Sequence, residues 1–316
     1  MRPLFRFARQ AALTMISMAS CLVSTVAPAQ ETAAQAPVRS FVAAPVANIN
    51  ITPRRVVFDG TKRTEAVYVF NQGTAPVTVD IGLVDNVMLR NGEIVPPEKL
   101  AKRDAADQAA GARLQSAREF ILASPSRLTL PPGKGRTIRL RAAAPDGVTV
   151  SEWRTHLTVT TVPTADAGLT AEAAAGLRTG ELAFKIQSVF GISIPLILRS
   201  GTVDATAAIS DLKLGMIDAP VGPAGEVRQV QALTFDLTRT GNGSIFGNLE
   251  VKSQHKKQNE IIGYVRGLAV YPEIDSRRVA IPLMRVPQSG ETVSVTFISD
   301  DPQLPNLRPT GTLIVP

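Results

Sequence analysis

Residues 182–198 constrain this chain more than any other segment, because apolar and polar side chains alternate along the whole run. Every even-numbered position except Ser188 is apolar, and the odd-numbered positions include Lys185 and Gln187. This alternation is typical of a β-strand with one buried face, and the run is about three times the usual strand length. Either the chain's own domain or another protein must cover that face. Pro195 favours another protein, because proline occurs on edge strands, which can pair with an incoming chain.

Further strand signals recur on both sides of this run and end at Gly, Pro, Asn or Asp. The predicted strands are residues 49–51, 55–58, 65–71, 77–84, 127–130, 137–142 and 155–162 before the run, and 208–214, 230–239, 244–252, 267–272, 278–283, 292–299 and 311–315 after it. Residues 97–118 are rich in good helix formers and predict one or two helical turns, with Gly111 as a break. Strands at this spacing predict an all-β chain of two β-sandwiches, with a short helical insert in the first.

The first 29 residues are typical of a secretory signal peptide. Arg2, Arg6 and Arg9 precede an apolar stretch that ends in Ala27-Pro28-Ala29, a site suited to signal peptidase. The stretch is too short and too often interrupted by Ser and Thr to span a membrane. A lipoprotein box ending at Cys21 is the alternative, in which a lipid would anchor the chain. Residues 30–45 lack periodicity and are predicted to form a flexible arm.

Composition excludes several classes of protein. The chain has 44% hydrophobic residues, enough for a sizeable core, but only one Cys and two His. We therefore expect no internal disulfide, no metal site and no cofactor. The formal net charge is +7, but three of the basic residues lie in the leader and the others are scattered, so no nucleic-acid partner is expected.

No catalytic motif occurs in the sequence. Residues 191–195 lack the last glycine of a nucleophile elbow, and residues 133–137 lack the order of a phosphate-binding loop. His156 lies in a predicted strand and His255 in a polar stretch, and the two are far apart in sequence and have no paired partner. The sequence therefore predicts that the protein is not an enzyme.

Several motifs resemble, in the right order, the first domain of the PapD-like periplasmic chaperones of the chaperone-usher pilus pathway. They are residues 51–60 (ITPRRVVFDG), 69–71 (VFN), 124–133 (SPSRLTLPPG) with 137–140 (TIRL), Glu152 with Pro163, and 192–199 (ISIPLILR). The last motif looks like the divergent branch of the family that handles spore-coat-like subunits. The second half is matched mainly by strand content.

The resemblance implies two immunoglobulin-like domains in an L or boomerang arrangement, over residues 46–200 and 205–316. It implies a periplasmic chaperone that binds, folds and caps pilus or fimbrial subunits by donor-strand complementation and delivers them to an outer-membrane usher. The alternative is an exported immunoglobulin-like structural or adhesive module without chaperone activity. The sequence leaves open whether the free protein caps itself as a dimer.

The resemblance also implies site residues by position. The donor strand would present Phe184, Ile186, Ser188, Phe190 and Ile192. A cleft arginine that binds the subunit's terminal carboxylate falls on Arg55, with Arg54 as the alternative, and a guanidinium suits that task. The family's cleft lysine falls on Pro195, which carries no charge. Glu152 and Arg199 match the interdomain ion pair of the family.

Overall fold

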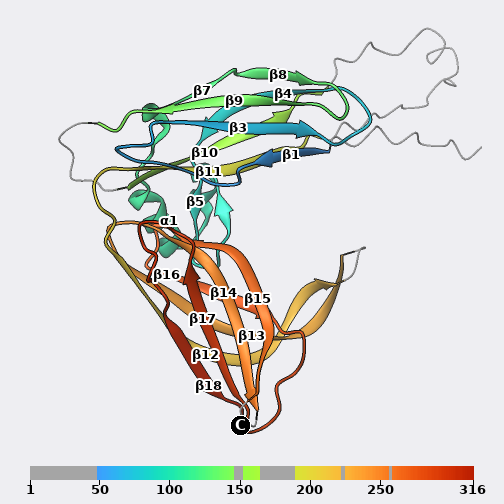
Figure 1. Ribbon diagram of the computed structural model, residues 1–316, viewed down its shortest axis with the longest axis vertical. Coiled ribbons are helices and arrows are strands. Elements are labelled where there is room, and N and C mark those ends of the chain that lie inside the picture. Colours follow the sequence, from blue (N-terminus) through green and yellow to red (C-terminus); the bar gives the residue numbers. More distant parts are fainter. Residues whose placement is uncertain (1–47, 146–151, 164–188, 222–224, 256–257) are drawn as a thin grey trace, which may run out of the picture. The chain divides into compact units, whose positions relative to one another are not determined.

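The computed structural model describes residues 48–145, 152–163, 189–221, 225–255 and 258–316. The predicted signal peptide, the N-terminal arm and residues 182–188 of the alternating run lie outside the described residues. Strands dominate the described part of the chain, and its helices are confined to residues 97–120 (Figure 1). The predicted all-β fold class is confirmed.

The first sandwich consists of two sheets that face each other as layers in Figure 1. The four-stranded sheet has the order β1 (Ile49–Thr52), β3 (Thr64–Asn71), β9 (Gly135–Ala142) and β7 (Ile121–Ser124); the five-stranded sheet has the order β2 (Val56–Phe58), β11 (Gly191–Arg199), β10 (Glu152–Thr161), β4 (Val77–Val84) and β8 (Arg127–Leu130). Alternation is visible in β3, where Val67 and Val69 are fully buried and Ala66 and Tyr68 are exposed. Full burial of such an aliphatic side chain contributes roughly 1.5 to 3 kcal/mol.

Prolines stand where the chain crosses between the two sheets. Pro53 separates β1 from β2, and Pro125 separates β7 from β8. Because proline has no N–H to donate, it cannot continue a ladder of hydrogen bonds. The chain therefore leaves one sheet at these positions and joins the other, and β1 and β2 become edge strands of different sheets.

The second sandwich has a counterpart for each strand predicted after the alternating run. One sheet has the order β12 (Ala205–Val221), β13 (Glu226–Gly241) and β16 (Ser276–Pro282); the other has the order β15 (Gln258–Val270), β14 (Ile245–His255), β17 (Thr292–Ser299) and β18 (Thr310–Ile314). The predicted bounds were too short for β12, β13 and β15. These strands continue through polar sequence because each has a neighbouring strand that accepts its backbone hydrogen bonds.

The insert contains more structure than predicted. A hairpin of β5 (Val87–Met88) and β6 (Ile94–Val95) precedes two 3-10 turns, η1 (Pro97–Lys102) and η2 (Arg118–Phe120), which flank helix α1 (Ala105–Arg113). Asp104 caps α1 by accepting a hydrogen bond of 2.9 Å from the Asp107 backbone N–H. The prediction that Gly111 breaks the helix is wrong. Gly111 lies inside α1, where any side chain would overlap Leu100 of η1.

The alternating run does not form a single strand as long as predicted. Strand β11 begins at Gly191, and Val189 and Phe190 lie in no strand. The Thr161 N–H donates to the Phe190 carbonyl at 2.8 Å, at the last residue of β10. Strand β10 ends at Thr161, and the pairing of β10 with β11 ends at this point.

Candidate functional site

Strand β11 has an open edge along its first half. On one side it pairs with β10 from Gly191 to Arg199. On the other side it pairs with β2 only at Leu196 to Leu198. Within the described residues, Gly191 to Pro195 therefore have no strand partner on that side. Unpaired backbone groups on an edge are a template for another strand.

The direction of the backbone groups along this edge follows from the last contact with β10. The Phe190 carbonyl accepts from the Thr161 N–H, and the Phe190 N–H donates to Thr161 Oγ1 at 2.9 Å. Phe190 thus faces β10. Because facing alternates along an antiparallel strand, Gly191, Ser193 and Pro195 face the open edge. Proline is tolerated at position 195 because its nitrogen points away from the existing ladder.

A groove of about 510 Å³ lies beside this edge. Residues of β1 and β11 line it together with Arg54 and Gln72; the full lining is Asn48, Ile49, Asn50, Ile51, Arg54, Gln72, Ile192, Ser193 and Ile194. Strand β1 is itself an edge strand of the other sheet. The groove is therefore bounded by two strand edges. Its lining combines the half-buried side chains of Ile49 and Ile192 with polar residues, a surface suited to an extended peptide segment.

The described members of the predicted donor strand lie at the start of β11. Phe190 is 41% exposed, and Ile192 is half-buried against the core of the first sandwich. The other predicted members, Phe184, Ile186 and Ser188, lie outside the described residues.

The two candidate anchor arginines lie in different surroundings. Arg54 is exposed, lines the groove and makes no ion pair with any residue in the described part of the chain. The Arg55 side chain is only 12% exposed, and its Nη2 lies 3.5 Å from Asp301 Oδ2. Its guanidinium lies 4.5 Å above the ring centre of Phe246, and burial lowers the pKa of Arg55.

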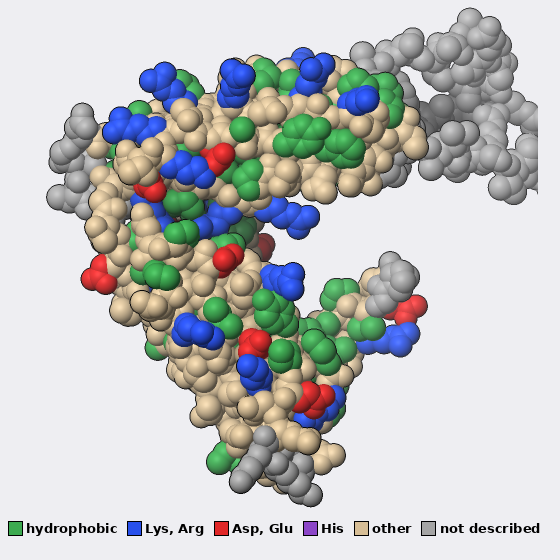
Figure 2. Space-filling view, in the orientation of Figure 1, with side chains coloured by type: hydrophobic (Ala, Val, Ile, Leu, Met, Phe, Trp, Pro, Cys, Tyr) green, Lys and Arg blue, Asp and Glu red, His purple; other side chains and the backbone are tan. Residues whose placement is uncertain are grey.

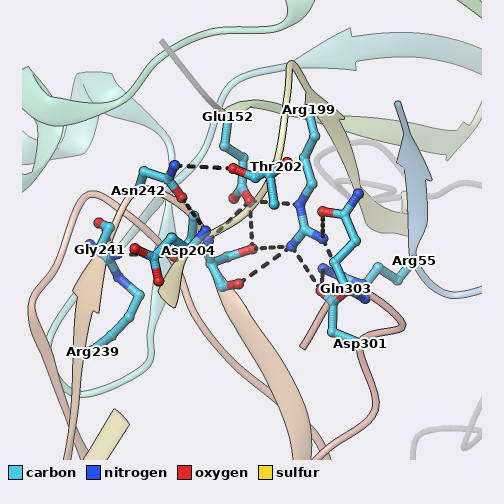
Figure 3. Close-up of polar contacts among 12 residues, drawn as sticks. Arg55, Glu152, Arg199, Thr202, Asp204, Arg239, Gly241, Asn242, Asp301 and Gln303 are labelled. Carbon is cyan, nitrogen blue, oxygen red and sulfur yellow. Dashed lines mark hydrogen bonds and ion pairs between the residues drawn. The ribbon is translucent and has the colours of Figure 1, made fainter. Parts of the chain in front are cut away.

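The predicted pair of Glu152 and Arg199 is brought together, within a larger buried network (Figure 3). Arg199 Nε donates to Glu152 Oε2 at 3.0 Å, and its Nη1 and Nη2 donate to the two carboxylate oxygens of Asp301 at 3.0 and 2.8 Å. The Ser244 N–H and hydroxyl each donate to Glu152 Oε2 at 3.0 Å. Arg199 thus forms a two-pronged contact between β11 and the loop after β17.

These contacts fix the protonation of the network. Burial would by itself raise the pKa of Asp301, but the hydrogen bonds and charge of Arg199 outweigh it and hold that pKa below its ordinary value. Burial by itself would lower the pKa of Arg199. The carboxylates of Asp301 and Glu152 raise it, and the net effect is an increase. Both groups are therefore charged at neutral pH, and the pair is an ion pair.

A second buried cluster was not predicted from the sequence. Arg154 forms an ion pair with Glu273, donates to the Asn86 carbonyl at 2.8 Å and lies 4.1 Å above the Tyr271 ring. Nothing in the sequence indicated that Glu273 or Asp301 would be buried, because both lie in polar segments that are typical of turns. Arg154 lies two residues after Glu152, so the two side chains would share one face of a strand. Only this spacing could have suggested that Arg154 is a buried charge.

His156 lies beside Arg154. Its Nε2 is 3.2 Å from Arg154 Nη1, and the residue is buried. Burial first, and the charge of Arg154 second, lower the pKa of His156 to about 3. It is therefore neutral at physiological pH. The side chain of His255 lies outside the described residues.

The described part of the chain holds no group of three or more His, Cys, Asp or Glu side chains that could bind a metal ion. None of its helices combines the length and the apolar character needed to cross a bilayer. On the face visible in Figure 2, Lys and Arg side chains are dispersed rather than joined in one basic stripe.

Comparison with known proteins finds no matching family model and no matching curated protein. Among solved structures, the chain is similar to the YadV chaperone at 14% identity, with 84% of this chain and 99% of that chain covered and a TM-score of 0.40. It is similar to the CupB2 chaperone of Pseudomonas aeruginosa at 14% identity, with 84% and 100% covered and a TM-score of 0.37. It is also similar to the CsuC–CsuE chaperone–tip adhesion subunit complex of Acinetobacter baumannii at 12% identity, with 85% and 98% covered and a TM-score of 0.40.

Proposed function

We propose that this protein is a periplasmic chaperone that binds pilus or fimbrial subunits by lending them a β-strand. The observation that carries the proposal is the open edge of β11 at Gly191 to Pro195, which lies beside the groove between β1 and β11. The ordered sequence motifs of the first sandwich support the same class of protein. An outer-membrane usher is the proposed acceptor of the subunit.

The proposed binding mode requires no catalytic residue, metal or nucleotide. A subunit that lacks its last strand has unpaired backbone groups and an uncovered apolar groove. The edge-facing residues Gly191 and Ser193 would supply backbone hydrogen bonds, while Phe190 and Ile192 would supply apolar side chains. Phe184, Ile186 and Ser188 stay predicted donor residues.

The carboxylate anchor is proposed at Arg54 in preference to Arg55. Arg54 is exposed on the groove, so its guanidinium is available to a subunit's terminal carboxylate. Arg55 already lies against Asp301 and Phe246 and would have to leave both. With Pro195 in place of the family's cleft lysine, Arg54 would provide the positive charge that this edge otherwise lacks.

Co-expression with a strand-deficient subunit encoded beside an usher gene tests the proposal. We expect a stable one-to-one complex on size-exclusion chromatography. Phe190→Asp and Ile192→Asp should abolish it, because a carboxylate cannot enter the subunit's apolar groove. Leu122→Asp is the matched control, since Leu122 is 72% exposed on β7, away from the groove residues. A complex that survives both Phe190→Asp and Ile192→Asp contradicts the proposal. The failure to form a complex with any such subunit also contradicts it, and either result favours an exported structural module.

The proposed compartment has its own test. The mature protein should begin after Ala29, which mass spectrometry of periplasmic extract would show. Cys21→Ala should leave both the mass and the soluble fraction unchanged. A mature chain that begins at Cys21 and carries a lipid would instead indicate a membrane-anchored protein.

A further inference from the structure

The insert between β4 and β7 belongs to the first sandwich by chain order but packs into the second. Its buried apolar side chains share one core cluster with β13, β14, β16 and β17; they are Val87, Met88, Leu89, Val95, Leu100 and Ala110. Leu100 and Val95 are 6% and 2% exposed. The core of the second sandwich is thus completed by residues that lie more than a hundred positions earlier in the chain.

Polar contacts tie the insert to the segment before and within β16. Arg113, at the end of α1, donates to both carboxylate oxygens of Asp275 at 2.9 and 2.7 Å and to the Pro272 carbonyl at 2.8 Å. The Arg278 N–H donates to the Arg90 carbonyl at 2.7 Å, which adds a bond at the free edge of β16.

The β5–β6 hairpin also contacts residues beside and within β16. The Met88 N–H donates to Glu273 Oε1 at 3.1 Å, and Glu273 is also the partner of Arg154 on β10. Gly92 has a φ of 85°, and a side chain there would overlap the guanidinium of Arg277. Glycine is therefore required for two independent reasons, its backbone conformation and the close approach of Arg277.

Two sandwiches joined by a short link normally move relative to each other unless their interface is large and hydrophobic. Here the link between β11 and β12 is residues 200–204. The insert supplies the hydrophobic contact that such a link lacks, because its buried side chains form one cluster with those of the second sandwich. From this arrangement we propose that the insert is a clamp that makes the two sandwiches one cooperative folding unit. The proposal does not depend on the proposed chaperone function.

Equilibrium unfolding in urea can test the clamp with two local probes. Trp153, the only tryptophan, is 5% exposed in the first core and packs edge-on against Phe120, so its fluorescence reports the first sandwich. Hydrogen exchange of peptides from β14 and β17, read by mass spectrometry, reports the second. In the purified chain both probes should show the same midpoint. Leu140→Ala, a change confined to the first core, should lower both midpoints together by about 1 M urea.

Breaking the clamp should separate the two transitions. In the double variant Val95→Asp, Leu100→Asp, we expect different midpoints, and adding Leu140→Ala should then move only the tryptophan transition. The matched control is Lys99→Asp, Lys102→Asp, which places the same charges on exposed positions of η1 and should keep the midpoints together.

Three results would overturn the clamp. Leu140→Ala in the otherwise unchanged chain could move only the Trp153 transition, which would show independent sandwiches. The clamp variant could keep coincident midpoints. Or Asp301→Ala, which breaks the network of Arg199 and leaves the insert intact, could separate the transitions while the clamp variant does not. If the double Asp variant does not fold, the milder double variant Val95→Ala, Leu100→Ala takes its place in each comparison.

Discussion

The two halves of β11 share one alternating sequence but lie in different surroundings. Among the strands that the structure describes, Gly191 to Pro195 have a neighbour on one side only, and Gly191 and Ser193 are exposed. Leu196 to Arg199 are buried throughout: Leu196 and Leu198 face the first core, and Ile197 packs into the core cluster of the second sandwich. The second half is part of two buried cores, and the first half has an open edge among the described strands.

The largest expected effect is at the closed end of the strand. Arg199→Met keeps roughly the volume of the side chain but leaves the buried Glu152 without its cation and Asp301 with Arg55 alone, at 3.5 Å. Breaking a buried pair in this way costs about 3 to 5 kcal/mol of unfolding free energy, measurable by urea denaturation. Arg103→Met is the control, because its pair with Glu93 is exposed and should cost less than about 1 kcal/mol. Equal effects of the two variants would show that the Arg199 network does not hold the junction.

A matched pair of apolar truncations compares the two halves directly. Leu196→Ala should destabilise the protein by about 2 to 5 kcal/mol, because it leaves a cavity in the first core. Ile192→Ala should cost less than half as much, since Ile192 is only half-buried, yet it should weaken the complex with a subunit more strongly. Denaturation of each variant, together with pull-down of the subunit, checks both statements. A larger stability loss at Ile192 would place it in the core and contradict the comparison.

The boundary between the halves predicts a pH dependence. His156 is the β10 partner of Pro195, and its pKa falls from 6.5 to about 3 on folding. Between these values the unfolded chain binds this proton and the folded protein does not, so stability falls as the pH is lowered from 6.5 towards 3. The slope from this group is at most roughly 1.4 kcal/mol per pH unit. His156→Gln should reduce the slope, whatever it does to stability at pH 7.5; an unchanged slope would mean that His156 does not titrate in this range.

The smallest expected effect tests which backbone groups face the open edge. Ser193→Pro removes an N–H that has no strand partner, whereas Ile192→Pro removes one that faces β10. Relative to the corresponding alanine variants, proline at position 192 should cost about 1 kcal/mol more than proline at position 193. Denaturation curves of the four variants measure this difference. The reverse order would mean that the odd-numbered residues, and not the even-numbered ones, bond to β10.

Much of the architecture was predictable because it depends on local alternation. Val67 and Val69 are buried and Tyr68 is exposed, as the pattern of β3 indicated. Strand ends were less predictable. The early start of β15 at Gln258 depends on pairing with β14, and the β5–β6 hairpin is too short to leave a periodic signal.

The candidate site was only partly predictable. Sequence position indicated Glu152 and Arg199, which lie together, and named Arg55 as the anchor with Arg54 as the alternative. The two arginines lie in the connection between β1 and β2, so the directions of their side chains depend on how that connection bends. One then lines the groove, and the other reaches Asp301. No local pattern could reveal that Asp301 and Glu273 are buried ion-pair partners from the second half of the chain.

The sequence by itself determined the fold class, the alternation of the strands and the prolines at which the chain changes sheets, because each depends on a few neighbouring residues and their backbone preferences. The tertiary structure decided which half of β11 is paired on both sides, which arginine is free and where the insert packs. Each of these depends on a contact between residues far apart in the chain, and burial, pairing and pKa are set by such contacts.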